Sequence, residues 1–512
     1  MPHLANHPSV IMWVMTNESN NWHEYERTTL YGHFKKLDPS RPAIRASYDT
    51  PDAFDVHSYH GMWKGCSGDF DLNARVKADK ARELKLPWMI TEYLENLGDL
   101  RRQRKWFGPE VDSADPKAIA RLAELSRDFH AQRAMDQTEV SRRLDYCAIL
   151  PFGPGFWIGG DGKPSVTGHA VASALAPVGL SIDLFNQHFE AASDLETQLW
   201  VTNDTGEKVA GKVRCALVAT NPGFDPAAAL PEALFKGELD FEAGARAVAR
   251  LPFTWKLPKA EGQYWLVARL ERPGAAPVES RRPILVLARQ QPPKELAGRK
   301  LLVVEGDGKF SAWAAGLGCQ VLAAGKSAPA EAELVVIAPG AAMSEDFKKL
   351  APDLGNYLRG GGRVLVLEQL EWPAKLKDPF NLQIERTDYD PDPATGEAYG
   401  GSSRVWRWEQ PERAFWRELP DNGLWRWNGF QGRVARVSLA ARPDRARVLA
   451  RYAESDREDL KQVPVAAVAH GKGELLCFLL RVSGRYDRAE KNFDPVVERL
   501  MINLLGDWKE TK

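Results

Sequence analysis

Short apolar runs alternate with long helical patterns over the first 157 residues, and this alternation restricts the fold more than any other feature of the sequence. Apolar runs of four or five residues are typical of strands buried on both faces. Such strands, when helices separate them, predict a parallel sheet with crossover connections. The expected strands are Val10–Val14, Ala43–Ala46, Phe54–His57, Trp88–Thr91 and Ala148–Leu150, and the expected helices are Leu72–Leu84 and Pro116–Leu144, the latter capped by Asp115.

Two of these apolar runs lead into a glutamate. The first is HPSVIMWVMTNES (His7–Ser19), which ends in Asn17-Glu18, and the second is LPWMITEYLEN (Leu86–Asn96), which reaches Glu92. In a (β/α) barrel, catalytic side chains lie at the carboxyl ends of the strands. Two glutamates in that position are the groups that glycosidic cleavage needs, one as general acid and the other as nucleophile or base. Glu18 and Glu92 are 74 residues apart, which fits three βα steps of roughly 25 residues each.

The composition excludes several classes of protein. A length of 512 residues predicts three or four domains. The formal net charge of −1 predicts no basic face for nucleic acid, and no apolar run approaches the length of a membrane span. Five scattered cysteines without a CxxC pair argue against a disulfide framework and a zinc site. No signal peptide is expected at the amino terminus of this sequence, and the compartment stays open.

In the rest of the chain the hydrophobic pattern changes twice, first to that of an all-β region and then back to α/β. Period-two runs such as Leu195–Asn203 and Lys212–Thr220 predict a β sandwich of immunoglobulin-like type. From Leu301 the pattern is again α/β. The expected strands there are Leu301–Gly308, Glu333–Gly340, Arg363–Gln369 and Leu475–Val482, and the expected helices are Leu350–Gly362 and Pro495–Leu505.

The motifs HPSVIMWVMTNES, LDPSRPAI (Leu37–Ile44) and PWMITEY (Pro87–Tyr93), taken in this order, resemble the catalytic barrel of glycoside hydrolase family 2. That family includes β-galactosidases, β-glucuronidases and β-mannosidases. The resemblance implies Glu18 as acid/base, Glu92 as nucleophile, and Asn17 as the group that holds the sugar 2-hydroxyl. The chemistry requires neither a metal nor an organic cofactor.

The same resemblance implies two aromatic site residues. Tyr59, in DVHSYHGMW (Asp55–Trp63), would hydrogen-bond the nucleophile. His57 and His60 in the same segment are alternatives for this role, or each is an ordinary core or surface histidine. Trp157, in LPFGPGFW (Leu150–Trp157), would form the floor of the sugar site or simply close the barrel rim.

The expected architecture is multidomain α/β plus β. Residues 1–175 would form strands four to eight of a (β/α)8 TIM barrel, so that strands one to three are missing and Met1 is an internal start in a longer parent. Residues 176–290 would be the immunoglobulin-like sandwich, 291–300 a linker, and 301–512 a region that resembles a glutamine-amidotransferase-like α/β domain. The turn Pro339–Met343 has alanine where a nucleophile would stand, and Cys319 enters a strand. This last domain is therefore expected to have no chemistry of its own and to be either structural or assembly-forming, in the second case through association of copies of the chain.

Two functions are consistent with these features. The first is a retaining β-glycosidase acting on a β-glycoside, with the carboxyl groups of Glu18 and Glu92 about 5–5.5 Å apart. The second is a non-catalytic carbohydrate-binding or assembly protein derived from such an enzyme. The sequence does not fix the sugar.

Overall fold

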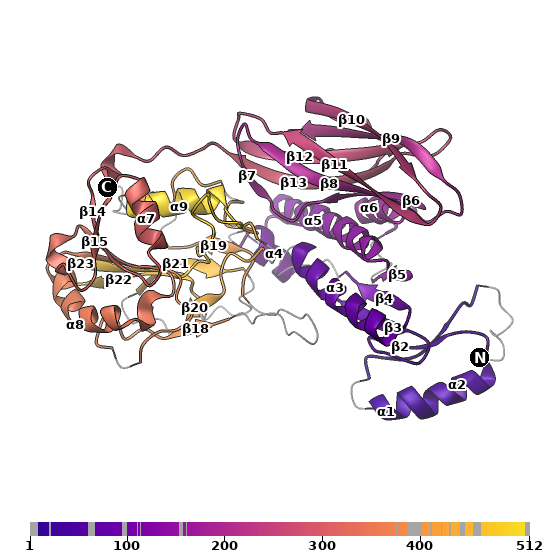
Figure 1. The fold of residues 1–512 in the computed structure, drawn as a ribbon, viewed down its shortest axis with the longest axis horizontal. Helices are drawn as coiled ribbons and strands as arrows, with labels where there is room; N and C mark the ends of the chain where they lie inside the picture. Colours follow the sequence, from indigo (N-terminus) through magenta and orange to yellow (C-terminus); the bar gives the residue numbers. More distant parts are fainter. Residues whose placement is uncertain are drawn as a thin grey trace.

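A computed structural model of the chain describes residues 9–19, 22–59, 67–94, 100–109, 111–112, 114–152, 157–159, 161–374, 376–387, 401–409, 412–420, 422–429, 432–440, 446–453 and 462–506. Of the motifs quoted above, residues 7–8, 60–63, 95–96 and 153–156 lie outside these ranges. Figure 1 shows an amino-terminal α/β region in indigo and purple, a β sandwich in magenta, and a carboxy-terminal α/β region in orange and yellow. The expected mixed α/β-plus-β, multidomain class is confirmed at this level.

The described part of the amino-terminal region contains five strands in two short parallel sheets. One sheet pairs β1 with β2, and the other has the order β3-β4-β5. No closed barrel is present among the described residues. The elements are β1 (Trp13–Asn17), α1 (His23–Tyr25), the π-helical η1 (Glu26–Leu30), α2 (Tyr31–Leu37), β2 (Ala43–Ala46), β3 (Phe54–Ser58), α3 (Ser67–Leu84), β4 (Trp88–Tyr93), α4 (Leu100–Phe107), α5 (Pro116–Arg143), β5 (Ala148–Pro151) and α6 (Val166–Ala174).

The first expected strand, Val10–Val14, is wrong by three residues. The strand runs from Trp13 to Asn17 because its backbone pairs with Ala43–Ala46 through the polar residues at its end. Apolar character marks burial, whereas hydrogen bonding to a neighbour sets where a strand begins and ends. For the same reason Glu92 lies inside β4 and not after it. The predicted N-cap is confirmed, since the Asp115 carboxylate accepts the N–H groups of Lys117 and Ala118.

The sandwich is built from long antiparallel strands. A five-stranded sheet, β10-β9-β12-β13-β7, faces a three-stranded sheet, β11-β8-β6, and only β7 runs parallel to its neighbour β13. The apolar faces of both sheets form one core around the fully buried Trp255. The strands are β6 (Val178–Asp183), β7 (His188–Glu190), β8 (Asp194–Asn203), β9 (Val209–Val218), β10 (Ala233–Ala243), β11 (Ala247–Lys256), β12 (Gly262–Glu271) and β13 (Val278–Leu287).

The carboxy-terminal region has one continuous eight-stranded sheet, β15-β14-β16-β17-β23-β22-β21-β19, with a small β18-β20 sheet beside it. Its first five strands are parallel, and the last three are antiparallel. The strands are β14 (Lys300–Val304), β15 (Gln320–Ala323), β16 (Leu334–Ile337), β17 (Arg363–Val366), β18 (Ile384–Arg386), β19 (Val405–Arg407), β20 (Val437–Leu439), β21 (Ala446–Tyr452), β22 (Val465–His470) and β23 (Gly473–Phe478).

The helices of this region are α7 (Lys309–Gly316), α8 (Glu345–Arg359) and α9 (Pro495–Leu505), with the 3-10 turns η3 (Lys294–Leu296), η4 (Pro329–Glu331), η5 (Ala341–Met343) and η6 (Ala414–Trp416). Cys319 is buried, as its place before a strand predicted. The turn η3 falls in the segment expected as a linker, and its Leu296 is fully buried against the core.

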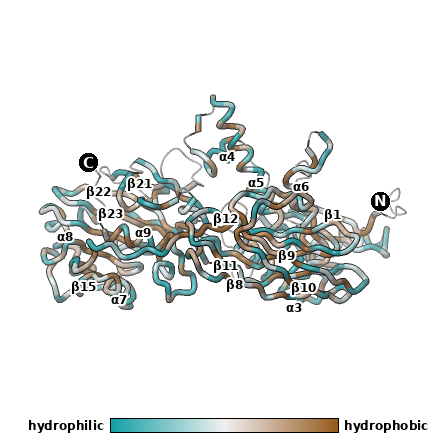
Figure 2. The backbone as a smooth tube through the Cα atoms, turned by 90° about the horizontal axis from the view of Figure 1, so that it is seen from above, coloured by the Kyte–Doolittle hydropathy of each residue, from teal (hydrophilic) through white to brown (hydrophobic). Residues whose placement is uncertain are grey.

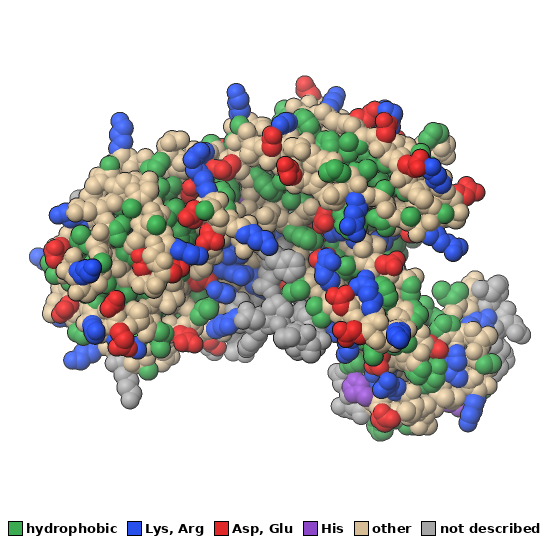
Figure 3. All heavy atoms as spheres, in the orientation of Figure 1, with side chains coloured by type: hydrophobic (Ala, Val, Ile, Leu, Met, Phe, Trp, Pro, Cys, Tyr) green, Lys and Arg blue, Asp and Glu red, His purple; other side chains and the backbone are tan. Residues whose placement is uncertain are grey.

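The long helix α5 joins the amino-terminal region to the sandwich. Its carboxy-terminal half is buried, and Glu139 on this half forms an ion pair of 2.6 Å with Arg282 of β13. Figure 2 colours each residue by its hydropathy. Hydrophobic residues, in brown, run through the interior, and a further hydrophobic stretch enters β1 at the edge of the molecule. On the face seen in Figure 3, positive and negative side chains are interspersed. Within the described residues, no helix is long and apolar enough to cross a membrane.

Candidate functional site

The carboxyl ends of the amino-terminal strands carry the candidate site, and three of them end in an unusual backbone conformation. Glu18 follows β1 with φ of 49°, Ser47 follows β2 with φ of 73°, and Leu94 follows β4 with φ of 71°. Residues other than glycine rarely adopt this left-handed conformation, and such strain concentrates at functional sites. Each of these residues turns the chain sharply where its strand ends.

The strand register also shifts at this end of the sheets. In the β1–β2 pair, Val14 faces Ile44 but Asn17 faces Ala46, so β1 contains one extra residue. In the β3–β4 pair, β4 contains one extra residue between Ile90 and Glu92. Bulges of this kind redirect side chains and occur next to active sites. They bring Glu18 and Glu92 toward the same point above β3.

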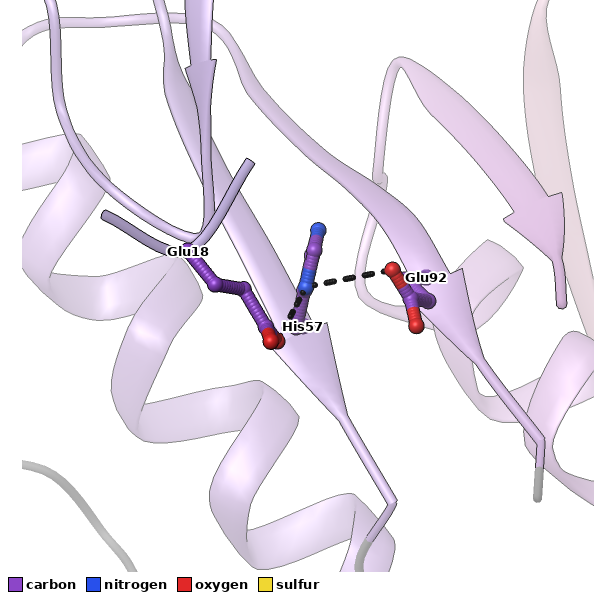
Figure 4. A group of neighbouring side chains, drawn as sticks. All are labelled: Glu18, His57 and Glu92. Carbon is purple, nitrogen blue, oxygen red and sulfur yellow. Dashed lines mark hydrogen bonds and ion pairs between the residues drawn. The ribbon is translucent and has the colours of Figure 1, made fainter. Parts of the chain in front are cut away.

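His57 of β3 lies between the two glutamates, as Figure 4 shows. Its Nδ1 atom is 2.7 Å from Glu18 Oε1 and 3.3 Å from Glu92 Oε2. Carboxylate oxygens of the two glutamates lie within 4.8 Å of one another. The His57 side chain is 4% exposed, that of Glu92 16% and that of Glu18 51%, so the site opens to solvent on the Glu18 side.

Tyr59 approaches Glu92 from the loop after β3. Its hydroxyl donates a hydrogen bond to Glu92 Oε1, and its ring meets Phe152 edge-on with 6.4 Å between the ring centroids. Glu92 therefore has Tyr59 on one oxygen and His57 on the other. The structure thus brings together four of the six residues singled out in the sequence, namely Glu18, His57, Tyr59 and Glu92.

The other two residues lie apart from this cluster in different ways. Asn17 is exposed at the end of β1, directly before Glu18. Trp157 is half-buried, and its carbonyl oxygen accepts the N–H of Ser165, which is the N-cap of α6. Its indole nitrogen is buried without a hydrogen-bond partner among the described atoms. The sugar-binding roles of Asn17 and Trp157 stay predictions.

Asp55 is the residue of this site that sequence reasoning missed. It is buried, its Oδ2 atom accepts the N–H of Ser47 at 2.7 Å and the hydroxyl of Thr91 at 2.7 Å, and its Oδ1 atom accepts the N–H of Thr91 at 3.1 Å. Burial raises the pKa of this carboxyl group above its ordinary value. Asp55 and His57 alternate along β3 and so share one face. This alternation with His57 is the signal in the sequence that points to Asp55. A search restricted to carboxylates at strand ends does not find it, because Asp55 lies within β3.

The Glu18, His57 and Glu92 side chains offer donor atoms that a metal ion accepts. Two ligands of one tetrahedral zinc ion lie about 3.3 Å apart, since each bond is about 2.0 Å long. The 2.7 Å between His57 Nδ1 and Glu18 Oε1 is instead a hydrogen-bond distance. The cluster therefore has the geometry of a hydrogen-bonded network.

Two glutamates near the carboxyl ends of parallel strands are the groups that glycosidic cleavage needs. Residues 2–105 match the family model described as "Glycosyl hydrolases family 2, TIM barrel domain". The resemblance seen in the sequence is confirmed over this segment, and the match supports a glycoside hydrolase as the general class. A search among curated proteins gives no match.

Solved structures with partial likeness include three enzymes. The β-D-mannosidase from Dictyoglomus thermophilum has 17% identity and a TM-score of 0.37, over 55% of this chain and 39% of that one. The exo-chitosanase CsxA from Amycolatopsis orientalis has 15% identity and a TM-score of 0.34, over 56% and 37%. The endo-β-1,4-mannanase from Thermotoga petrophila has 12% identity and a TM-score of 0.22, over 51% and 60%. This chain thus spans well under half of the first two enzymes.

Proposed function

We propose that the amino-terminal region carries the catalytic pair of a retaining β-glycosidase. One observation carries this proposal, namely the carboxylate oxygens of Glu18 and Glu92 within 4.8 Å of one another across a partly open site. Retaining enzymes hold their two carboxyl groups about 5–5.5 Å apart, whereas inverting enzymes need more room for a water molecule. The substrate class is a carbohydrate with a β-glycosidic bond.

The surroundings of the two glutamates support different roles. Glu92 is the more enclosed carboxylate and accepts a hydrogen bond from the Tyr59 hydroxyl, so it attacks the anomeric carbon and forms a glycosyl-enzyme. Glu18 is half-exposed and reaches the leaving group, whose oxygen it protonates as the bond breaks. Glu18 then takes a proton from water, and that water displaces the sugar from Glu92.

The test is covalent trapping followed by mass spectrometry. The purified chain would be incubated with a panel of 2-deoxy-2-fluoro β-glycosides that have good leaving groups. We expect one sugar to add its mass to the peptide that contains Glu92, and we expect no adduct in Glu92→Gln. Labelling of another carboxylate, or turnover that survives in both Glu18→Gln and Glu92→Gln, would reject the proposed mechanism.

A second candidate is a non-catalytic carbohydrate-binding or assembly protein. The row of described strands leaves both outer strands exposed, with Ile11 and Val14 at β1 and Leu150 at β5 among the exposed apolar side chains. Open apolar edges favour pairing with another chain. Binding of a β-glycoside without turnover, measured by calorimetry on the unmodified chain, would favour this candidate.

We also propose the division into residues 1–175, 176–290, 291–300 and 301–512. The three largest apolar clusters support it, because each lies mainly in one region. The regions also pack against one another, since Leu285 and Leu287 of β13 join the carboxy-terminal cluster and Ala453 joins the amino-terminal one. An immunoglobulin-like type for the sandwich, an amidotransferase-like type for the last region, and association of copies through that region remain predictions. Sedimentation of the whole chain tests the association.

A further inference from the structure

We infer that the acid proton of the catalytic pair is shared between Glu18 and His57, because Thr91 and Asp55 keep a proton on the far nitrogen of His57. In this arrangement Thr91 and Asp55 are positioning residues, since they act on the site only through His57. The catalytic meaning of the inference rests on the proposed function, whereas the proton arrangement itself follows from the contacts of the described residues.

The first step concerns the Nε2 side of His57. The Thr91 hydroxyl has a single proton, and it donates this proton to Asp55 Oδ2 at 2.7 Å. Asp55 also accepts two backbone N–H groups, so its oxygens act as acceptors. Thr91 Oγ1 is 3.3 Å from His57 Nε2 and has only lone pairs left to offer. Nε2 must therefore carry a proton, and Asp55 Oδ2 at 3.7 Å favours that proton electrostatically.

The second step concerns the Nδ1 side. A neutral histidine with its proton on Nε2 has a lone pair at Nδ1. That lone pair cannot face an ionised Glu18 oxygen at 2.7 Å without a proton between the two atoms. The proton sits either on Glu18, which then donates to His57, or on His57, which then donates to Glu18. Both states contain the same number of protons, so the proton belongs to the pair.

The third step explains why Glu18 and not Glu92 shares this proton. Glu92 is farther from Nδ1, at 3.3 Å, and its other oxygen accepts the Tyr59 hydroxyl. Among the described residues, the carboxylates that face His57 within 4 Å are Glu18, Asp55 and Glu92, and Tyr59 acts through Glu92. Glu92 thus does not share this proton and acts as the nucleophile. Glu18 passes the shared proton to the leaving oxygen and regains one from water in the second half of the reaction.

Thr91→Val tests this inference, because it removes the hydroxyl and nearly preserves the shape of the side chain. Without the hydroxyl, neutral His57 is free to place its proton on Nδ1 and donate it to ionised Glu18. Thr91→Ser restores the hydroxyl and is the rescue variant. Thr50→Val is the matched control, since Thr50 is also buried in this region and its hydroxyl donates to the Ala43 carbonyl, away from His57.

The direct measurement is ¹⁵N NMR of ring-labelled histidine, with the His57 signals assigned by their loss in His57→Gln. We expect Nε2 to be protonated from pH 5 to 8 in the unmodified chain, in Thr91→Ser and in Thr50→Val, and Nδ1–H to become populated in Thr91→Val. A neutral His57 with its proton on Nδ1 in the unmodified chain would overturn the inference. So would a Thr91→Val spectrum identical to that of the unmodified chain.

The second measurement is the pH profile of kcat/KM on the glycoside found by trapping. Donation from Nδ1 stabilises ionised Glu18, so Thr91→Val should move the alkaline limb to lower pH by about half to one unit, as expected for one hydrogen bond gained by the ionised carboxylate. An unmoved limb would overturn the inference. If the chain shows no turnover but NMR finds Nε2–H as expected, the proposed function fails while the proton arrangement stands.

Discussion

The amino-terminal and carboxy-terminal regions both place a glutamate at the carboxyl end of a parallel strand, but its neighbours differ. Glu368, two residues after β17, is buried and accepts Arg436 Nε at 2.7 Å and both the N–H and the hydroxyl of Ser483 at 3.0 and 2.6 Å. Glu18 instead meets His57 with Glu92 close by, and half of its side chain faces solvent. A carboxylate whose oxygens are occupied by donors stabilises the fold, whereas one that faces a second carboxylate is available for proton transfer.

The sheets of the two regions also differ in how deeply their strands are buried. Strands β14, β16 and β17 lie inside one continuous sheet and are almost entirely buried. Strand β1 is only partly covered, with Val14 55% exposed. The carboxy-terminal sheet thus has the burial of a stable scaffold. In the amino-terminal region β2 and β3 are buried as well, whereas β1, which leads to Glu18, is less covered.

The largest expected effect tests directly whether Glu92 serves catalysis while Glu368 serves stability. Glu92→Gln should lower kcat about 10³-fold or more, because it removes the nucleophile, with little change in the free energy of unfolding. Glu368→Gln should leave kcat within about twofold and lower the free energy of unfolding by about 2 kcal/mol, because it weakens charge-assisted hydrogen bonds. Steady-state kinetics and urea unfolding measure both. Equal loss of activity in both variants would contradict the assignment of Glu92 to catalysis and of Glu368 to stability.

The next effect tests the contact between the sandwich and the carboxy-terminal region. His188 Nδ1 of β7 is 2.9 Å from Asp494 Oδ2, and both side chains are buried. Burial raises the pKa of Asp494, but His188 and two backbone N–H groups outweigh it and hold the pKa below its ordinary value. His188→Ala should lower the free energy of unfolding at pH 7 by about 3 kcal/mol.

The pH dependence of this effect has a fixed sign. A lowered carboxyl pKa stabilises the fold above the ordinary pKa and loses that contribution as the pH falls. The difference between His188→Ala and the unmodified chain in urea unfolding should therefore shrink below about pH 4. A variant that loses kcat but keeps its stability would show that this contact serves the site rather than the scaffold.

Asp69 of α3 tests the contact between the amino-terminal and carboxy-terminal regions. It is buried, Arg433 Nη2 lies 3.3 Å from its Oδ2, and burial raises its pKa to about 6 against the partial opposition of Arg433. A raised carboxyl pKa destabilises the fold above that pKa, so stability rises as the pH falls from 6 toward 4. Asp69→Asn should remove this dependence.

Urea unfolding at pH 4.5 and 7 gives the measurement for Asp69. The stability of Asp69→Asn relative to the unmodified chain should be higher at pH 7 than at pH 4.5, by an amount of up to about 2 kcal/mol. The comparison between the two pH values cancels the other titrating groups. A relative stability that does not change with pH would mean that Arg433 fully compensates the buried charge.

The smallest expected effect concerns the helix caps, and it compares the local stability of one helix in each region. Asp115 caps α5 in the amino-terminal region, and Ser344 caps α8 in the carboxy-terminal region through the N–H of Phe347 at 3.2 Å. Asp115→Ala and Ser344→Ala should each lower the free energy of unfolding by about 1 kcal/mol. Equal losses would show that the regions differ in their long-range contacts and not in local helix stability. A loss above about 2 kcal/mol in one variant would contradict this.

Most elements that depend on local patterns could be predicted. The strand Ala43–Ala46, the helix Pro495–Leu505 and the Asp115 cap have the expected positions, because apolar runs and capping residues act over a few neighbouring positions. The ends of β1 and β4 could not be predicted, because pairing with β2 and β3 sets them. Asp55 was missed for a related reason, since its partners lie elsewhere in the chain, Ser47 directly after β2 and Thr91 in β4.

The sequence by itself determined which residue types stand at the carboxyl ends of the strands, and hence the general class of the amino-terminal region. Only the tertiary structure decided that His57 lies between Glu18 and Glu92 and that Thr91 links His57 to Asp55. It also decided that Glu368 accepts hydrogen bonds from Arg436 and Ser483. The physical reason is that the interactions act over different distances along the chain. Chain order fixes what each strand carries, whereas distances between strands depend on bulges, register and burial that arise only when the strands pack.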